Sequence, residues 1–113
     1  MSAVPARRRP AEREAADDAE AVPWPRDVSR KPEMKISEVV DRLKTEFPAL
    51  SLSKVRYLEG EGLISPYRVG NGYRRYSKAD VERLRYALTA QRDEYLPLSV
   101  IRQRLAELDA SPR

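Results

Sequence analysis

The chain contains neither cysteine nor histidine among its 113 residues. Without cysteine there is no disulfide and no thiolate metal site, and without histidine the commonest general base and metal ligand are missing. No apolar run approaches the roughly 18 residues of a membrane span, and the N-terminal residues lack the apolar core of a secretory signal. We therefore expect a cytoplasmic protein that is not an enzyme, with no catalytic residue, metal site, cofactor or membrane partner.

The N-terminal third differs in composition from the rest of the chain. Residues 1–33 hold five of the nine prolines and the only tryptophan, Trp24, and show almost no apolar periodicity. Such a segment cannot bury enough apolar surface to offset the entropy of ordering it. The sequence predicts a disordered arm over 1–33, a folded domain over 34–109 and a tail over 110–113. Trp24 lies between two prolines, where it is either loosely packed on the domain or an anchor for another protein.

Four segments of the folded part have the apolar spacing of helices. The first is capped by Ser37 and ends near Phe47, and the second is capped by Ser51 or Ser53. The link between them is short, which is typical of a helix-turn-helix. A Ser-x-x-Asp capping sequence at residues 77–80 starts the third helix, and a proline in the first turn opens the fourth. The expected helices lie at about residues 37–47, 52–60, 78–92 and 96–110.

A β-hairpin is expected between the second and third helices, at about residues 64–76. Leu63-Ile64 begins it, and the Gly-Asn-Gly sequence at 70–72 is a strong turn signal because these residues tolerate positive φ. On the returning arm, alternation places Arg74 on the same side as Tyr76. The Tyr76 side chain either packs in the core or lies on the surface. The fold class is therefore mostly α with a small β-hairpin wing, a winged helix-turn-helix with four helices.

Positive charge is concentrated on this hairpin and on the helix before it. The chain has a net charge of +4, and between Leu63 and Lys78 there are four Lys/Arg and no Asp/Glu. A basic helix beside a basic hairpin is what a winged helix-turn-helix offers to double-stranded DNA, whose phosphates supply much of the affinity. The candidate DNA-binding residues are Ser51, Ser53, Lys54, Arg56, Tyr57, Arg68, Tyr73, Arg74 and Arg75.

These residues are assigned different expected contacts. Lys54 or Arg56 can reach guanine in the major groove, whereas Tyr57 is better suited to donating to a phosphate. The hairpin arginines fit phosphate or minor-groove contacts. The alternatives are a solvated helix face and an edge hairpin whose cations discourage aggregation.

Four stretches resemble the MerR family of bacterial transcription regulators: KISEVVDRL, VRYLEGEGLI, GYRRYSKADVERL and LPLSVIRQRL. They carry the family's R-Y-Y/F-E-x-x-G-L-L and G-Y-R-x-Y patterns and together cover residues 35–108. The stretch LTAQRDEYLPLSVIRQRL resembles an actinobacterial branch that includes regulators of cell-division genes.

The resemblance implies a winged helix-turn-helix with two further helices. It also implies that Arg56, Tyr57, Tyr73 and Arg74 contact DNA, chiefly its backbone, and that Lys54 stands where base contacts vary. Members of the family continue into a long helix that forms a homodimer. That helix is absent here, so we expect either a DNA-binding fragment or a minimal member.

The function expected from the sequence is sequence-specific binding of promoter or operator DNA by a nucleoid-associated transcription regulator. Its second helix, about residues 52–60, would lie in a major groove, and RNA polymerase is a possible partner. Two rivals remain open. One is an architectural, excisionase-like protein that bends DNA, and the other is a winged helix that docks on another protein.

Overall fold

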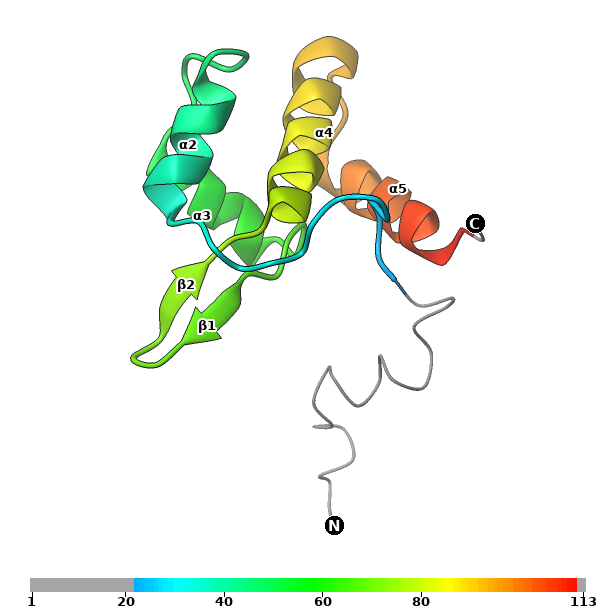
Figure 1. Ribbon diagram of the computed structural model, residues 1–113. Helices are drawn as coiled ribbons and strands as arrows, with labels where there is room; N and C mark the ends of the chain where they lie inside the picture. The colour runs from blue at the N-terminus through cyan, green and yellow to red at the C-terminus, as the bar shows by residue number, and fades with distance from the viewer. Residues whose placement is uncertain (1–21, 112–113) are drawn as a thin grey trace.

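The computed structural model describes residues 22–111. Within them, helices α2 and α3 form one pair, helices α4 and α5 form a second, and α2 also packs on α4 (Figure 1). The β-hairpin projects away from the helices, next to α3. The expected fold class, mostly α with a β-hairpin wing, is confirmed. In chain order the elements are α2 (Ile36–Lys44), α3 (Leu52–Gly60), β1 (Tyr67–Val69), β2 (Tyr73–Arg75), α4 (Lys78–Glu94) and α5 (Leu98–Ala110).

One hydrophobic core joins all four helices to the root of the hairpin. Tyr76, which follows β2, is the largest side chain that is completely buried. It therefore belongs to the core, the first of the two roles considered for it. Burial of these apolar side chains is the main force holding the helix pairs together. Each helix contributes to this core, with completely buried side chains that include Val39 and Leu43 of α2, Val55 and Leu58 of α3, Leu84 of α4, and Ile101 of α5.

Two of the four helix starts were predicted correctly. Ser51 caps α3, because its hydroxyl accepts from the Lys54 N–H at 3.1 Å, and the Ser77–Asp80 capping box opens α4. The first helix, however, starts two residues earlier than a cap at Ser37 requires. Its N-cap is Lys35, whose N–H donates to the Glu38 carboxylate at 2.8 Å. Helix α2 then ends at Lys44, three residues before the expected end. Helix α5 begins at Leu98, so Pro97 is its N-cap and does not lie in its first turn.

One prediction next to the hairpin was wrong, and one apolar residue of α3 is less buried than its spacing indicates. Leu63 and Ile64 do not begin a strand; they are buried in a loop, and β1 starts only at Tyr67. Leu52 has the apolar spacing of the second helix, but 42% of it is exposed at the first position of α3. A residue in the first turn of a helix lies at the edge of the core, so apolar spacing alone overestimates its burial.

Residues 22–33, here called the N-terminal segment, pack on the domain, although they were predicted to be part of a disordered arm. The segment runs from the outer end of α5 past α4 to α2 (Figure 1). The Trp24 ring packs edge-on against Tyr86 with centroids 5.4 Å apart, and Ser29 accepts from the N–H of Ala79 at 3.0 Å. The sequence concealed this because each contact partner lies more than 40 residues away. The part of the predicted arm over residues 1–21 lies outside the described residues.

Candidate nucleic-acid interface

Helix α3 exposes the polar side chains that its apolar spacing turns away from the core. Val55 and Leu58 are buried, so Ser53, Arg56 and Tyr57 face solvent. The Lys54 ammonium lies 5.7 Å from the centre of the Tyr57 ring. At this distance a cation–π interaction holds the two side chains together. Helix α3 therefore presents a short cationic and aromatic surface that no other described helix covers.

The hairpin places a second set of cations next to this surface. Its strands are antiparallel, with Arg68 opposite Arg74 and Val69 opposite Tyr73. The turn closes through a bond of 2.8 Å from the Gly72 N–H to the Val69 carbonyl. Both turn glycines have positive φ, +41° at Gly70 and +91° at Gly72, which other residues rarely adopt. Tyr73 is 65% exposed, so the hairpin offers aromatic as well as cationic contacts.

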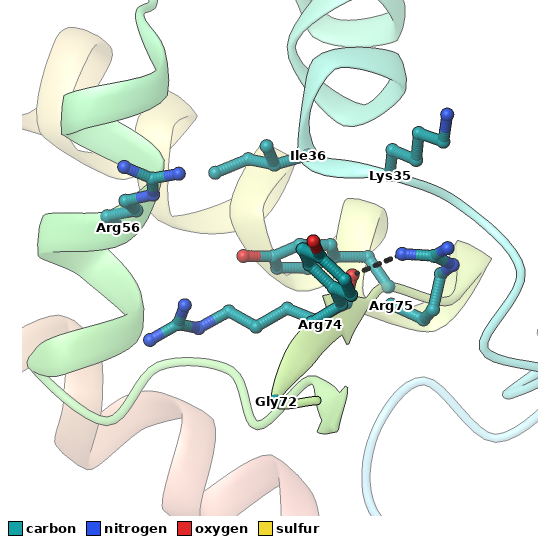
Figure 2. A pocket seen from close by; sticks show the side chains of 8 residues that line it. Lys35, Ile36, Arg56, Gly72, Arg74 and Arg75 are labelled. Carbon is teal, nitrogen blue, oxygen red and sulfur yellow. Dashed lines mark hydrogen bonds between the residues drawn. The ribbon is translucent and has the colours of Figure 1, made fainter. Parts of the chain in front are cut away.

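A hollow between the hairpin, α3 and the start of α2 collects four cations (Figure 2). We call it the basic hollow. Arg74 extends from β2 toward α3, from which Arg56 projects. Arg75 donates from Nη1 to the Arg74 carbonyl at 3.2 Å. No acidic residue lines the hollow, so its electrostatic character suits an anion. Its lining residues are Lys35, Ile36, Arg56, Gly72, Tyr73, Arg74, Arg75 and Tyr76.

Glu59 lies behind this hollow and joins α3 to β2. Its carboxylate accepts from Arg74 Nε at 2.7 Å and from the Tyr76 hydroxyl at 3.0 Å. Burial raises the pKa of Tyr76 to about 12, and the hydrogen bond to Glu59 adds to this rise. The hydrogen bond that Arg74 donates to Glu59 also raises the pKa of Arg74. Arg74 of β2 and Tyr76, which follows β2, thus share one carboxylate on the neighbouring helix.

The predicted site residues fall into three groups in the structure. The basic hollow brings together Arg56, Tyr73, Arg74 and Arg75. Helix α3 and its N-cap Ser51 carry the others apart from Arg68, which is exposed on β1. The Ser51 hydroxyl is used in capping α3, so this residue acts on the surface through the start of the helix.

Lys35 is the lining cation that was missed in the sequence. It precedes the first helix and is far from the hairpin in the chain. The Met34–Tyr76 bridge brings it there, with bonds of 2.9 Å and 2.8 Å between the two backbones. A signal did exist, since Lys35 is the last residue before an amphipathic helix whose N-terminus favours anions.

The described residues contain no cluster of three or more metal-ligating acidic side chains. Within that part of the chain, no helix has both the length and the apolarity to cross a membrane. The surface that stands out over residues 22–111 is therefore the cationic one formed by α3 and the hairpin.

A helix-turn-helix followed by a β-hairpin defines this chain as a winged helix-turn-helix domain. Residues 34–108 match the family model for MerR HTH family regulatory proteins. The match covers well over half of the chain, and the chain belongs to this family of DNA-binding transcription regulators. The resemblance found in the sequence motifs is thereby confirmed.

Curated relatives agree with this assignment. An uncharacterized HTH-type transcriptional regulator of Mycobacterium tuberculosis is 54% identical over 79 residues, which is 70% of this chain and 31% of the relative. A regulator of Mycobacterium bovis gives the same values. The HTH-type transcriptional regulator HmrR of Rhizobium leguminosarum bv. viciae is 43% identical over 67 residues, 59% of this chain and 46% of HmrR. The chain thus spans about a third of the length of the mycobacterial relatives.

Proposed function

We propose that the chain binds double-stranded DNA sequence-specifically, with α3 in a major groove and the hairpin on the flanking phosphates or in the minor groove. The observation that supports this is the basic hollow, where cations from three elements meet with no acid in its lining. Helix α3 has nine residues and is therefore about 13 Å long, a length that suits a major groove of similar width.

The proposal assigns roles to candidate side chains of α3 and the hairpin. Lys54 and Arg56 read base edges from α3, and Tyr57 donates to a phosphate. Arg68 and Arg75 contact phosphates from the hairpin. Ser53 and Tyr73 extend these contacts from exposed positions on α3 and β2.

Lys35 adds a phosphate contact from the start of α2, which the sequence alone did not suggest. It lines the hollow together with Arg56 and Arg75. A single phosphate group in the hollow would then be approached from the start of α2 and from β2 at once, beside Arg56, which extends from α3 to a base edge. Such convergence fixes the orientation of a protein on the duplex.

In this proposal the chain acts at promoter or operator DNA and is found on the nucleoid. Contact with RNA polymerase and pairing of two copies on a palindromic site belong to the same proposal, and family membership supports them. The link to cell-division genes remains a prediction from the sequence.

Selection from randomised duplexes, followed by fluorescence anisotropy across a salt series, tests the proposal. The expected result is a clear preference for the selected duplex over its scrambled version, with affinity falling steeply as salt rises. Equal, purely salt-driven binding to both duplexes, with a DNase footprint that spreads, would identify an architectural protein instead. No binding to either duplex would refute DNA binding and favour the protein-docking alternative.

A further inference from the structure

The Glu59 carboxylate lies next to the basic hollow and holds one of its cations, Arg74, in place. The Glu59 side chain is only 12% exposed, whereas that of its partner Arg74 is 35% exposed. The 2.7 Å bond uses Arg74 Nε. Both terminal nitrogens of Arg74 have no hydrogen-bond partner among the described residues.

The other side of Glu59 is fixed by the core. The completely buried Tyr76 donates its hydroxyl to the second carboxylate oxygen at 3.0 Å. Tyr76 is itself held by two backbone bonds to Met34. The carboxylate therefore has a defined position, and Arg74 is attached to a rigid acceptor rather than to a mobile surface group.

The charges around Glu59 explain why an acid is useful there. Arg68 lies directly opposite Arg74 on the hairpin, and like charges at opposite positions destabilise strand pairing. Arg56 lies one helical turn before Glu59, on the same side of α3. The Glu59 carboxylate therefore supplies the negative charge that offsets the cations where the hairpin meets α3.

We propose that Glu59 is a positioning residue for DNA binding. It holds Arg74 by Nε, so that the terminal nitrogens of Arg74 remain available to a DNA phosphate, and it fixes the angle between hairpin and α3. This inference rests on the proposed function. It goes beyond it by giving a role in DNA binding to an acidic residue that does not itself contact DNA.

For the removal of Glu59, the proposal predicts a change in DNA affinity opposite to the change expected from net charge alone. Removal of an acid from a DNA-facing surface ordinarily increases affinity, because one fewer negative charge repels the phosphates. If Glu59 positions Arg74, its removal decreases affinity. The alternative is that Arg74 must leave Glu59 before it binds a phosphate, and then the removal of Glu59 increases affinity.

The principal variant is Glu59→Gln, which keeps the size of the side chain and loses its charge. We expect about a tenfold weaker binding to the selected duplex, the loss of roughly one charge-assisted contact. The matched control is Glu61→Gln, at the C-cap of α3, which removes the same charge from an exposed pair with Arg102. The control is expected to bind as tightly as the wild type or slightly more tightly.

A double-mutant cycle tests whether Glu59 acts through Arg74. In an Arg74→Ala background, Glu59→Gln should cost no further affinity. Tyr76→Phe keeps the ion pair but removes the hydroxyl donor, and about a threefold loss is expected. An equal loss from Glu59→Gln with and without Arg74 would overturn the proposal, as would tighter or unchanged binding by Glu59→Gln.

A measurement on the wild-type protein covers the case in which the variant fails to fold. The Arg74 Nε–H resonance is followed by NMR in the free protein and in the DNA complex. Persistence of slow exchange with solvent in the complex supports the proposal, and loss of protection on binding overturns it. If the wild type binds no duplex at all, the proposed function itself fails. If the wild type binds normally and Glu59→Gln binds more tightly, only the proposed role of Glu59 fails.

Discussion

Arg83 on α4 and Asp109 on α5 form an ion pair, with 2.7 Å between Nη1 and Oδ1, and the N-terminal segment is attached to both. The backbone N–H of Trp24 donates to the Asp109 carboxylate at 2.9 Å, and the backbone carbonyl of Trp24 accepts from Arg83 at 2.7 Å. Arg83 also donates to the Leu63 carbonyl at 2.8 Å. One arginine thus connects the second helix pair, the root of the hairpin and the N-terminal segment.

Replacement of Asp109 by alanine should therefore destabilise the domain. It leaves Arg83, whose side chain is only 12% exposed, without its carboxylate, and it removes the acceptor of the Trp24 N–H. We expect a loss of about 2 kcal/mol in the free energy of unfolding, below the value for a fully buried pair because Asp109 is partly exposed. Urea denaturation followed by circular dichroism measures it.

The matched control is Asp93→Ala, which breaks a pair with Arg92 whose side chains are 53% and 52% exposed. Exposed pairs contribute little, so a loss much smaller than that of Asp109→Ala is expected. Equal effects of the two substitutions would show that the Arg83–Asp109 pair has no special structural role.

Trp24 offers a test of the N-terminal segment that needs no substitution. It is the only tryptophan, and its ring packs against Tyr86 and the core. If the segment is part of the cooperative unit, tryptophan fluorescence and the helical circular dichroism signal should change at the same urea concentration. A fluorescence transition at lower urea would mean that the segment detaches before the helices unfold.

The features that the sequence predicted well are those fixed by neighbouring residues. The Ser51 cap, the Ser77–Asp80 capping box and the turn glycines at 70 and 72 each depend on a few adjacent positions. Alternation along β2 correctly placed Arg74 on the side of Tyr76, and both contact Glu59. The sequence motifs were sufficient to recognise the family because they lie on these local elements.

The features that the sequence did not reveal depend on distant contacts. The Trp24–Asp109 bond joins residues 85 positions apart, and a proline-rich composition gave no indication of it. Lys35 reaches the basic hollow only because Met34 pairs with Tyr76. Glu59 is the acid of the R-Y-Y/F-E pattern, but its partners Arg74 and Tyr76 are brought to it only when the hairpin folds back onto α3. In each case three-dimensional proximity, rather than periodicity, decides the role.

Two arginines of the proposed interface should give different binding phenotypes. Arg56→Ala removes a proposed base contact from α3, so we expect a loss of about 1–3 kcal/mol in binding free energy and relaxed specificity. Arg68→Ala removes a proposed phosphate contact, so binding to all duplexes should weaken alike and the salt slope should fall by about one. Anisotropy with the selected and scrambled duplexes separates the two.

Arg104→Ala is the control for both arginine substitutions, because Arg104 lies on α5 and pairs with Glu94 at 3.1 Å, away from the hairpin. It removes the same charge and should change affinity little. If all three variants behave alike, net charge rather than the proposed interface governs binding.

Asp80 predicts a pH dependence of stability with a definite sign. Burial raises the pKa of its carboxyl group above the ordinary aspartate value, although Ser77 and the nearby Arg30 and Arg83 oppose the rise. Between the ordinary value and the raised one, the folded chain binds more protons at this site than the unfolded chain. The contribution of Asp80 to the free energy of unfolding therefore decreases as pH rises through this window.

Asp80→Asn isolates this contribution, because an amide oxygen can still accept from the Ser77 N–H that bonds to Asp80 at 3.0 Å. Urea denaturation of both proteins is repeated from acidic to neutral pH. The stability of the wild type relative to the variant should decrease as pH rises and become constant once Asp80 is ionised in both states. A difference that increases with pH would mean that the bonds from Ser77 and the neighbouring arginines outweigh burial, and that the carboxylate stabilises the start of α4.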